Sequence, residues 1–224
     1  MASGLQARRR TQAERSGATR RLLLDATVEC LAERGYGGAT TTEIADRAGV
    51  SRGAQLHHFP TKEELVIAAI EHVFTRRHQE YVETMARIPA GHDRGTAAIE
   101  KLWTMFSGPT FHAWLELLVA ARTDAALRKG ISGVAERFVA NVERTFKETF
   151  PEAQGSPFAA VACGFTFALL QGLALENILE GRLSRERTAR VLDAFRWLSE
   201  LVLPGAHVSG PSRPAARAAA RRTR

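Results

Sequence analysis

The residues best suited to a chemical task in this 224-residue chain lie between Ala48 and Ala54. Ala48-Gly49-Val50 separates two short helical patterns, and Arg52 stands directly before the small residues Gly53 and Ala54. Two helices joined by such a turn form a helix-turn-helix, which presents its second helix to the major groove of DNA. Each base pair displays a distinct set of donors and acceptors there, and small residues let the helix backbone approach them. The pattern therefore predicts binding to double-stranded DNA.

Two helical patterns precede this segment and must brace it. Apolar residues recur at helical spacing from near Thr19, and glycines between positions 35 and 38 end that helix. Thr40-Thr41-Thr42-Glu43 is a capping box that opens the second helix. Gly49 stops this helix, because glycine readily adopts the left-handed backbone that a sharp turn needs.

The rest of the chain also has helical patterns. Ser51 caps a third, short helix that ends at His57 or His58. A second capping box at 61–64 opens a long helix that runs to about Arg87. Beyond this point no strand pattern occurs, and helices are expected near 94–106, 110–122, 124–149, 157–180 and 184–203.

The run from Leu24 to Leu65 resembles the tetracycline-repressor (TetR) family of transcriptional regulators. The features that match are the Glu-Arg-Gly-Tyr stretch that ends the first helix, Thr-x-x-Glu-Ile-Ala in the second, Ala-Gly-Val-Ser at the turn, and His-Phe-x-x-Lys after the third. The match covers roughly a fifth of the chain, and its features follow one another in order. The resemblance implies an all-α fold, with an N-terminal three-helix helix-turn-helix DNA-binding domain joined to a helical ligand-binding and dimerisation domain.

Composition and pattern together give four expected segments. These are a flexible basic arm at 1–17, the DNA-binding domain at 18–65, the ligand-binding and dimerisation domain at 66–203, and a disordered Arg/Ala/Pro tail at 204–224. Residues 1–62 carry ten Lys/Arg and six Asp/Glu, and residues 204–224 carry five Arg and no acid. The net positive charge therefore suits the two ends of the chain, and not the middle, to binding a polyanion such as DNA.

The resemblance also assigns DNA-contacting roles to individual residues. The predicted set is Thr41, Thr42, Ser51, Arg52, Gly53, Ala54, Leu56, His57, His58 and Lys62. Arg52 is the best candidate for direct readout, since a guanidinium can grip guanine O6 and N7 with two hydrogen bonds. A solvated surface charge is the alternative. Lys62 matches a phosphate-binding lysine at a helix N-terminus, where the helix dipole favours an anion.

One pair of residues departs from the family pattern. The family usually has Leu-Tyr where this chain has Gln55-Leu56. Leu56 cannot donate a hydrogen bond, but it can touch a thymine methyl group. Gln55 either reads adenine or occupies a partly buried site. His57 and His58 are adjacent and point about 100° apart on a helix, so phosphate contact or solvent exposure is favoured over metal binding.

Aromatic residues concentrate in the middle of the chain, and the resemblance implies that an apolar small molecule binds there. The predicted ligand-binding residues are Trp103, Phe106, Phe111, Trp114, Arg122, Phe138, Phe167 and Gln171. Burial in an ordinary core is the alternative for each aromatic side chain.

Two helical stripes near the end of the chain predict a dimer interface. Small residues recur every four positions at Ala160, Gly164, Ala168 and Gly172, and apolar residues recur at Val191, Phe195 and Leu198. The stripes match the family's dimer, although packing within one chain would produce the same pattern. A twofold dimer would present two recognition helices to one face of DNA and read a pseudo-palindrome.

The expected function is a sequence-specific DNA-binding regulator, a repressor that a small apolar ligand releases from its operator. An activator or a ligand-independent DNA-binding protein of the same fold is the alternative. A helical carrier or enzyme, or a protein whose arginine tail binds a membrane surface, belongs to a different class. The chain has no GxSxG, HExxH or phosphate-binding glycine loop, so no enzyme activity, cofactor or metal is predicted. Cys30 and Cys163 lie far apart in apolar patterns, which fits buried thiols in a reducing cytoplasm. The apolar stretch 158–175 contains Thr166 and Gln171, so we expect a buried helix there and no membrane span.

Overall fold

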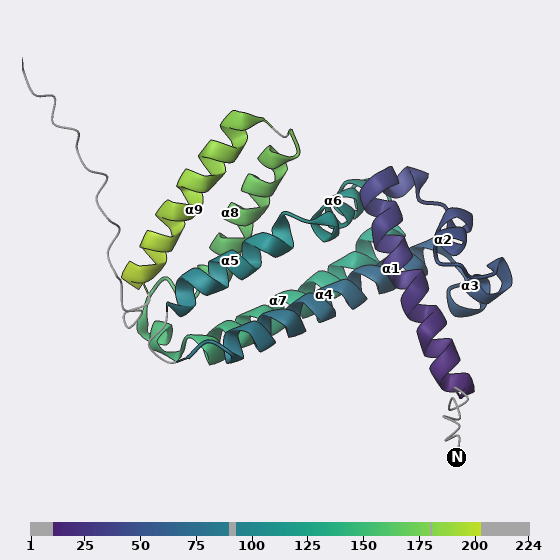
Figure 1. Cartoon of the computed structure of the whole chain (residues 1–224), viewed down its shortest axis with the longest axis horizontal. Coiled ribbons are helices and arrows are strands. Elements are labelled where there is room, and N and C mark those ends of the chain that lie inside the picture. Colours follow the sequence, from purple (N-terminus) through teal and green to yellow (C-terminus); the bar gives the residue numbers. More distant parts are fainter. Residues whose placement is uncertain (1–10, 90–92, 180, 203–224) are drawn as a thin grey trace, which may run out of the picture.

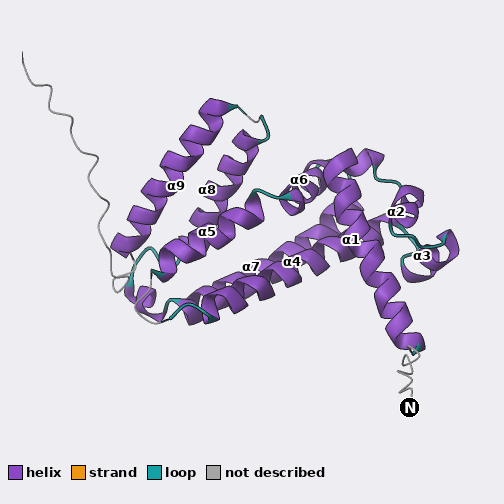
Figure 2. Ribbon diagram, in the orientation of Figure 1, coloured by secondary structure: helices purple, strands orange, loops and turns teal. Residues whose placement is uncertain are grey.

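The computed structural model describes residues 11–89, 93–179 and 181–202. All regular structure in these ranges is helical, and short loops join the helices (Figures 1 and 2). This confirms the expected all-α class. Within the same ranges, no helix combines the length and apolar character that crossing a bilayer requires.

Three helices form one end of the molecule (Figure 1). They are α1 (Gln12–Gly38), α2 (Thr41–Arg47) and α3 (Arg52–His58). Side chains of α1, α2 and the first turn of α4 (Lys62–Ala86) meet in one core. This core includes Leu23, Leu31, Ile44 and Leu65, none of which has measurable exposure. Burial of this core fixes the small α2 and α3, which are too short to be stable alone.

The predicted N-caps hold these helices in register. Thr40 Oγ1 accepts from the Glu43 amide at 3.2 Å, and Ser51 Oγ accepts from the Ala54 amide at 3.2 Å. Gly49 has the positive φ, +63°, that the sharp turn between α2 and α3 was expected to need. The two N-caps and the turn glycine are confirmed. The capping box expected at Thr40 forms only in part, since the Glu43 carboxylate pairs with Arg34 at 3.3 Å and no hydrogen bond from the Thr40 amide to Glu43 is present among the described residues.

The first helix begins earlier than the sequence analysis expects. Residues 12–17 were expected to belong to a flexible arm, but they lie in α1. The cause is a capping box that the analysis missed: Thr11 Oγ1 accepts from the Glu14 amide, and Glu14 Oε2 accepts from the Thr11 amide at 2.7 Å. The arm prediction is therefore wrong for residues 12–17, and residues 1–10 lie outside the described part. The expected tail at 204–224 also lies outside it.

Two long helices run side by side from the first three helices to the far end of the molecule (Figure 1). They are α4 (Lys62–Ala86) and α7 (Ala125–Thr149). The shorter α5 (Arg94–Phe106) and α6 (Pro109–Ala121) follow α4, and α6 packs against α1. Since α6 and α4 both contact α1, they connect the far part of the molecule with the helix-turn-helix.

The last two helices pack with α5 at the far end. They are α8 (Ala162–Asn177) and α9 (Arg182–Val202), and a short 3₁₀ segment at Pro151–Gly155 precedes α8. A helix was expected from residue 157, but residues 157–161 form turns with hydrogen bonds such as Val161 N to Phe158 O. Leu170 and Phe195 pack in a cluster with Ile99 of α5.

The two predicted dimer stripes differ in their placement. The small residues Ala160, Gly164, Ala168 and Gly172 are all exposed. By contrast, Phe195 is 7% exposed and packs inside the chain, and Val191 and Leu198 are half-buried. The stripe on α9 is therefore largely accounted for by packing within one chain, whereas the stripe of small residues is not.

Gly130 marks a close approach between α7 and α4. A Cβ placed on Gly130 would lie 2.2 Å from Cδ1 and 3.0 Å from Cγ1 of Ile67, whose β-branched side chain has little rotamer freedom. We expect Gly130→Ala to lower the free energy of unfolding by about 1–3 kcal/mol, despite the higher helix propensity of alanine. Denaturant unfolding measures this change.

Gly133 provides the matched control on the same helix. A Cβ there would meet only Arg137 Nη1, at 3.5 Å. Gly133→Ala should leave stability unchanged or raise it by up to about 1 kcal/mol. Equal stability of the two variants would show that α7 and α4 are not in tight contact at Gly130.

Candidate nucleic-acid interface and ligand cavity

The short helix α3 has one buried face and one exposed face. Arg52, Gly53 and His57 are exposed, and Leu56 is 44% exposed. Gln55 is fully buried, and its Nε2 donates to the Phe59 carbonyl at 2.7 Å. Of the two alternatives for Gln55, the structure therefore supports the buried site, and this residue is turned away from any ligand of the exposed face.

The predicted contact residues of α2 and α3 come together in one group. The Arg52 guanidinium donates through Nη1 to Thr41 Oγ1 at 2.7 Å and to Thr42 Oγ1 at 2.8 Å. Ser51 and Thr42 are exposed, and Ala54 and His58 are half-buried beside them. This arrangement puts one cation and several hydroxyl groups on the surface formed by α3 and the first turn of α2.

Lys62 is more enclosed than we expect of a lysine whose side chain is free to bind phosphate. Its Nζ donates to the Tyr36 carbonyl and lies 4.2 Å from the centre of the Tyr36 ring. Burial lowers the pKa of Lys62, and the nearby Glu63 opposes that effect. In the absence of DNA, Lys62 therefore ties the start of α4 to the end of α1.

Other arginines near this surface are already engaged. Arg47 forms two hydrogen bonds with the Glu33 carboxylate, at 2.9 and 2.6 Å, which joins α2 to α1 and lowers the pKa of Glu33. The Arg20 guanidinium lies over the Phe59 ring at 5.2 Å. These contacts hold α2 and the end of α3 against α1, so Arg47 stabilises the packing of the first three helices.

Beyond the helix-turn-helix, aromatic side chains of α4 to α8 line a cavity next to α6. Its walls include six residues of the predicted ligand set, Phe106, Phe111, Trp114, Phe138, Phe167 and Gln171, together with Phe74, Arg77 and Met105. It leaves about 680 Å³ of empty space, part of it open to solvent. The structure thus brings most of the predicted ligand residues together.

Two predicted ligand residues lie elsewhere. Trp103 packs in the apolar cluster that joins α5 to α8 and α9. Arg122 is exposed at the end of α6, where its carbonyl accepts from Arg128. Helical spacing places both residues near the aromatic segment but does not say which way they face, and neither lines the cavities described here.

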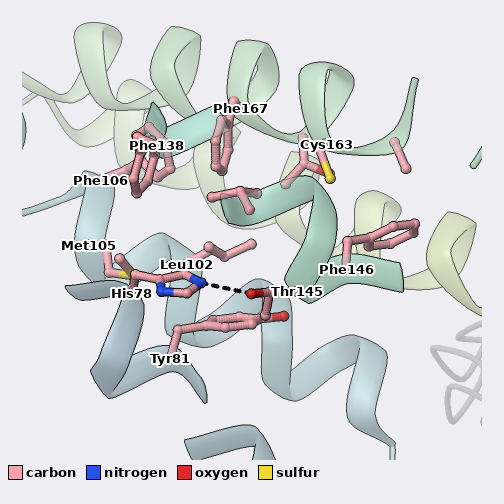
Figure 3. Close-up of a pocket in the computed structure, with 13 residues that line it drawn as sticks. His78, Tyr81, Leu102, Met105, Phe106, Phe138, Thr145, Phe146, Cys163 and Phe167 are labelled. Carbon is pink, nitrogen blue, oxygen red and sulfur yellow. Dashed lines mark hydrogen bonds between the residues drawn. The ribbon is translucent and has the colours of Figure 1, made fainter. Parts of the chain in front are cut away.

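Helix α4 supplies wall residues that were not predicted from the sequence. Phe74, His78 and Tyr81 fall at positions i, i+4 and i+7 and line the space between α4 and α7. Figure 3 shows His78 and Tyr81 with Phe106, Phe138 and Phe167 around a second cavity. The ligand set predicted from the sequence contains no residue of α4, although the helical spacing of these three side chains already indicated a shared face.

The polar groups of this second cavity are uncharged near neutral pH. His78 Nε2 lies 2.7 Å from Thr145 Oγ1 (Figure 3), and burial lowers the pKa of His78. Burial raises the pKa of Tyr81 and raises that of the Cys163 thiol to about 11. Each of these pKa shifts favours the neutral form, so the walls offer hydroxyl, thiol and imidazole groups without a net charge.

The cavity next to α6 has a direct physical link to α1. Phe111 and Trp114 of α6 line the cavity, and Glu116 of the same helix accepts from the Tyr36 amide at 3.3 Å. Gly35, directly before Tyr36, has φ +68°, and a Cβ there would lie 2.7 Å from Glu116 Oε2. A shift of α6 would therefore displace the end of α1 at Tyr36. Because the Tyr36 carbonyl accepts from Lys62, the start of α4 would move as well.

Comparison with known proteins places these features in context. Residues 23–69 match the family profile described as "Bacterial regulatory proteins, tetR family". The chain is 38% identical over 130 residues to the HTH-type transcriptional regulator CymR of Pseudomonas putida, an alignment that covers 58% of this chain and 64% of CymR, just under two thirds. It is 34% identical over 148 residues to an uncharacterised HTH-type transcriptional regulator of Mycobacterium tuberculosis, covering 64% of this chain and 76% of that protein.

Solved structures agree at the level of the fold. A transcriptional regulator from Pseudomonas aeruginosa PAO1 has a TM-score of 0.62 at 24% identity and covers 87% of this chain and 95% of its own. A TetR-family regulator from Rhodococcus sp. has a TM-score of 0.65 at 20% identity, covering 84% of this chain and 99% of its own.

Proposed function

The chain belongs to the TetR family of bacterial transcriptional regulators, and on that premise we propose that it is a ligand-responsive repressor that binds a pseudo-palindromic operator as a dimer. Family membership makes it a DNA-binding transcriptional regulator and not an enzyme. The single observation that carries the proposal is that one chain has both an exposed face on α3 and an aromatic cavity. The cavity is lined in part by α6, and α6 contacts α1. Such a regulator would act in the cytoplasm.

The DNA-binding surface of the proposal is α3 with the first turn of α2. Arg52, Thr41 and Thr42 form one hydrogen-bonded group, in which a guanidinium suited to guanine lies beside hydroxyls suited to phosphate. Leu56 and His57 extend the same exposed face. This group supports both parts of specific binding, which are positioning on the phosphates and reading of base edges.

The dimer of the proposal uses the outer face of α8. Its exposed small residues Gly164, Ala168 and Gly172 let another helix approach closely, and the exposed Phe165 and Leu175 supply apolar area. On α9, Leu183 and Trp197 are also exposed, at 79% and 55%. An apolar surface of this kind is typical of a protein interface.

The cavity supports the effector part of the proposal. Among structures with the same fold, the regulator FadR from Bacillus subtilis was solved in complex with stearoyl-CoA, and a regulator from Saccharomonospora viridis in complex with choline. We propose that a small molecule also occupies the cavity of this chain and shifts α6 against α1. Because the coupling is reciprocal, operator DNA must change ligand affinity by the same factor.

Selection of bound sites from random DNA tests the proposal. The full-length protein should recover a motif with twofold symmetry and half-sites about one helical turn apart. A reporter gene placed behind that motif should then be silenced by the protein. Recovery of no motif would contradict the proposed sequence-specific binding. Stimulation of the reporter would show that the protein is an activator and not a repressor.

The contact between Glu116 and Tyr36 gives a sharper test of the route from the cavity to DNA. Glu116→Ala removes the acceptor of the Tyr36 amide, and we expect operator affinity to change by about 1 kcal/mol, or roughly fivefold, although Glu116 lies on α6. Electrophoretic or anisotropy titration with operator DNA measures the change. Glu116→Gln keeps an acceptor oxygen and should retain most of the affinity. Loss of stability in Glu116→Ala with unchanged operator affinity would contradict this route.

A further inference from the structure

Three cavities lie in series between α4, α5, α7 and α8. The cavity next to α6 shares Met105, Phe106, Phe138 and Phe167 with the central cavity of Figure 3. The central cavity in turn shares Tyr81, Leu102, Phe146, Ala162 and Thr166 with a third cavity, which ends at α9. Several of the separating side chains are flexible, Met105 above all, so a ligand can join neighbouring cavities by turning them aside.

The series of cavities is elongated. On α7, its walls run from Ala135 in the cavity next to α6 to Phe146 in the cavity at α9. Eleven residues of helix correspond to roughly 16 Å. The space therefore suits an extended molecule better than a compact one.

Charge is confined to one of the three cavities. The described walls of the central and α9-end cavities contain no Asp, Glu, Lys or Arg. Among the described wall residues of the cavity next to α6, Arg77 alone is charged. Since apolar walls without charges disfavour an ion, a charged group of a ligand would be stable only in the cavity that contains Arg77.

The Arg77 charge is only partly neutralised. Its Nη1 donates to Glu80 Oε2 at 2.9 Å, but Lys101 Nζ lies 3.7 Å from the same oxygen, so two cations share one carboxylate. The Arg77 Nε is buried without a hydrogen-bond partner among the described residues. Arg94 and Arg196 share that last feature, but neither lines these cavities. The Gln171 side chain adds a further donor to the same walls.

We propose that these joined cavities bind an elongated amphipathic anion, a carboxylate with a long apolar tail. This inference rests on the proposed function, because it names the chemical class of the effector. The carboxylate lies at Arg77 and Gln171, and the tail passes Phe106 and Phe138 toward Phe158 at the α9 end. A guanidinium binds a carboxylate through charge-assisted hydrogen bonds, which are stronger than neutral ones.

A cationic ligand of the same length fits less well. Aromatic rings such as Trp114 can hold an ammonium group, but Arg77 lies in the same walls and would repel it. The nearest carboxylate that contacts Arg77, Glu80, is already shared by two cations. A neutral ligand would leave the Arg77 Nε unpaired.

The test compares probes of equal tail length on the full-length protein. Dodecanoate, dodecanol and dodecyltrimethylammonium are titrated below the concentrations at which they aggregate, with hexanoate as a short control. Tryptophan fluorescence and calorimetry report binding. We expect dodecanoate to bind at least tenfold more tightly than each of the other three probes. Equal or tighter binding of dodecanol or the ammonium probe would overturn the inference, as would equal binding of hexanoate.

Variants locate the two ends of the ligand. Arg77→Met should lower dodecanoate affinity at least tenfold and leave dodecanol affinity unchanged, whereas Arg77→Lys should keep most of the preference for the anion. Ala162→Phe, which narrows the passage toward α9, should weaken dodecanoate and spare hexanoate. Arg87→Met removes the same charge outside the cavities and should change nothing. Unchanged dodecanoate binding in Arg77→Met would overturn the placement of the anion.

A separate titration keeps this inference apart from the proposed function. Operator DNA is bound first, and dodecanoate is then added. Release of DNA supports both ideas. Tight dodecanoate binding without any effect on DNA supports the ligand class and contradicts its role as effector. Release of DNA by the ammonium probe alone would support an effector site and overturn the proposal that its ligand is an anion.

Discussion

Gly172→Arg is expected to convert the protein from a dimer to a monomer and to lower its affinity for a full operator by roughly 100- to 10,000-fold. Gly172 is exposed on α8, in line with Gly164 and Ala168. A dimer that holds two helix-turn-helix units gains affinity because binding of the second half-site is intramolecular once the first is bound. A charged, long side chain within the helix contact would remove that gain.

The isolated chain should tolerate this substitution. A Cβ on Gly172 meets no atom within 4 Å, and the same is true of Gly164. Arginine also has a higher helix propensity than glycine, so α8 should not weaken. Any loss of assembly can therefore be assigned to a partner surface and not to the fold of one subunit.

Light scattering after gel filtration, together with titration of full-site and half-site DNA, measures both effects. Half-site affinity should stay the same in Gly172→Arg, because α3 is unchanged. Ser132→Arg, which adds the same side chain to an exposed position on α7, is the matched control and should remain dimeric. A Gly172→Arg protein that still elutes as a dimer would show that α8 is not the interface.

The sequence was most informative where one residue type has one local task. The caps Thr40 and Ser51 and the turn glycine Gly49 could be predicted because a short side chain or a missing Cβ satisfies a requirement of the backbone itself. The start of α1 was misplaced because the basic, polar composition of residues 1–17 outweighed a capping box at Thr11. Composition describes an average, whereas a cap acts at a single position.

Partners across the fold could not be predicted in the same way. A helical stripe such as Val191 and Phe195 shows that a face is packed, but not whether the neighbour belongs to the same chain. Trp103 illustrates the same gap among the aromatic residues, since it fills a core, whereas Trp114 lines the cavity. Gln55 was left open between two environments, and its burial depends on packing of α3 that no local pattern encodes.

Arg52→Ala should give the second large effect, a loss of about 1–3 kcal/mol, or roughly 5- to 150-fold, at the preferred operator. The two threonine hydroxyls that hold its guanidinium restrict the side chain before DNA arrives, which reduces the entropy lost on binding. The loss should also be selective: replacing the base that Arg52 reads should weaken the wild-type protein and leave the variant almost unaffected.

Arg52→Lys separates base readout from phosphate contact, because lysine keeps the charge but cannot form the two parallel hydrogen bonds of a guanidinium. If Arg52 reads guanine, Arg52→Lys should lose most of the specificity and keep the salt dependence of binding. If it contacts phosphate alone, Arg52→Lys should bind almost normally, and Arg52→Ala should lose affinity equally for all sequences. Arg87→Ala, at a side chain that is 78% exposed beyond the end of α4, controls for the change in net charge and should bind as the wild type does. An Arg52→Ala protein that also matched the wild type would mean that α3 does not read the groove through this residue.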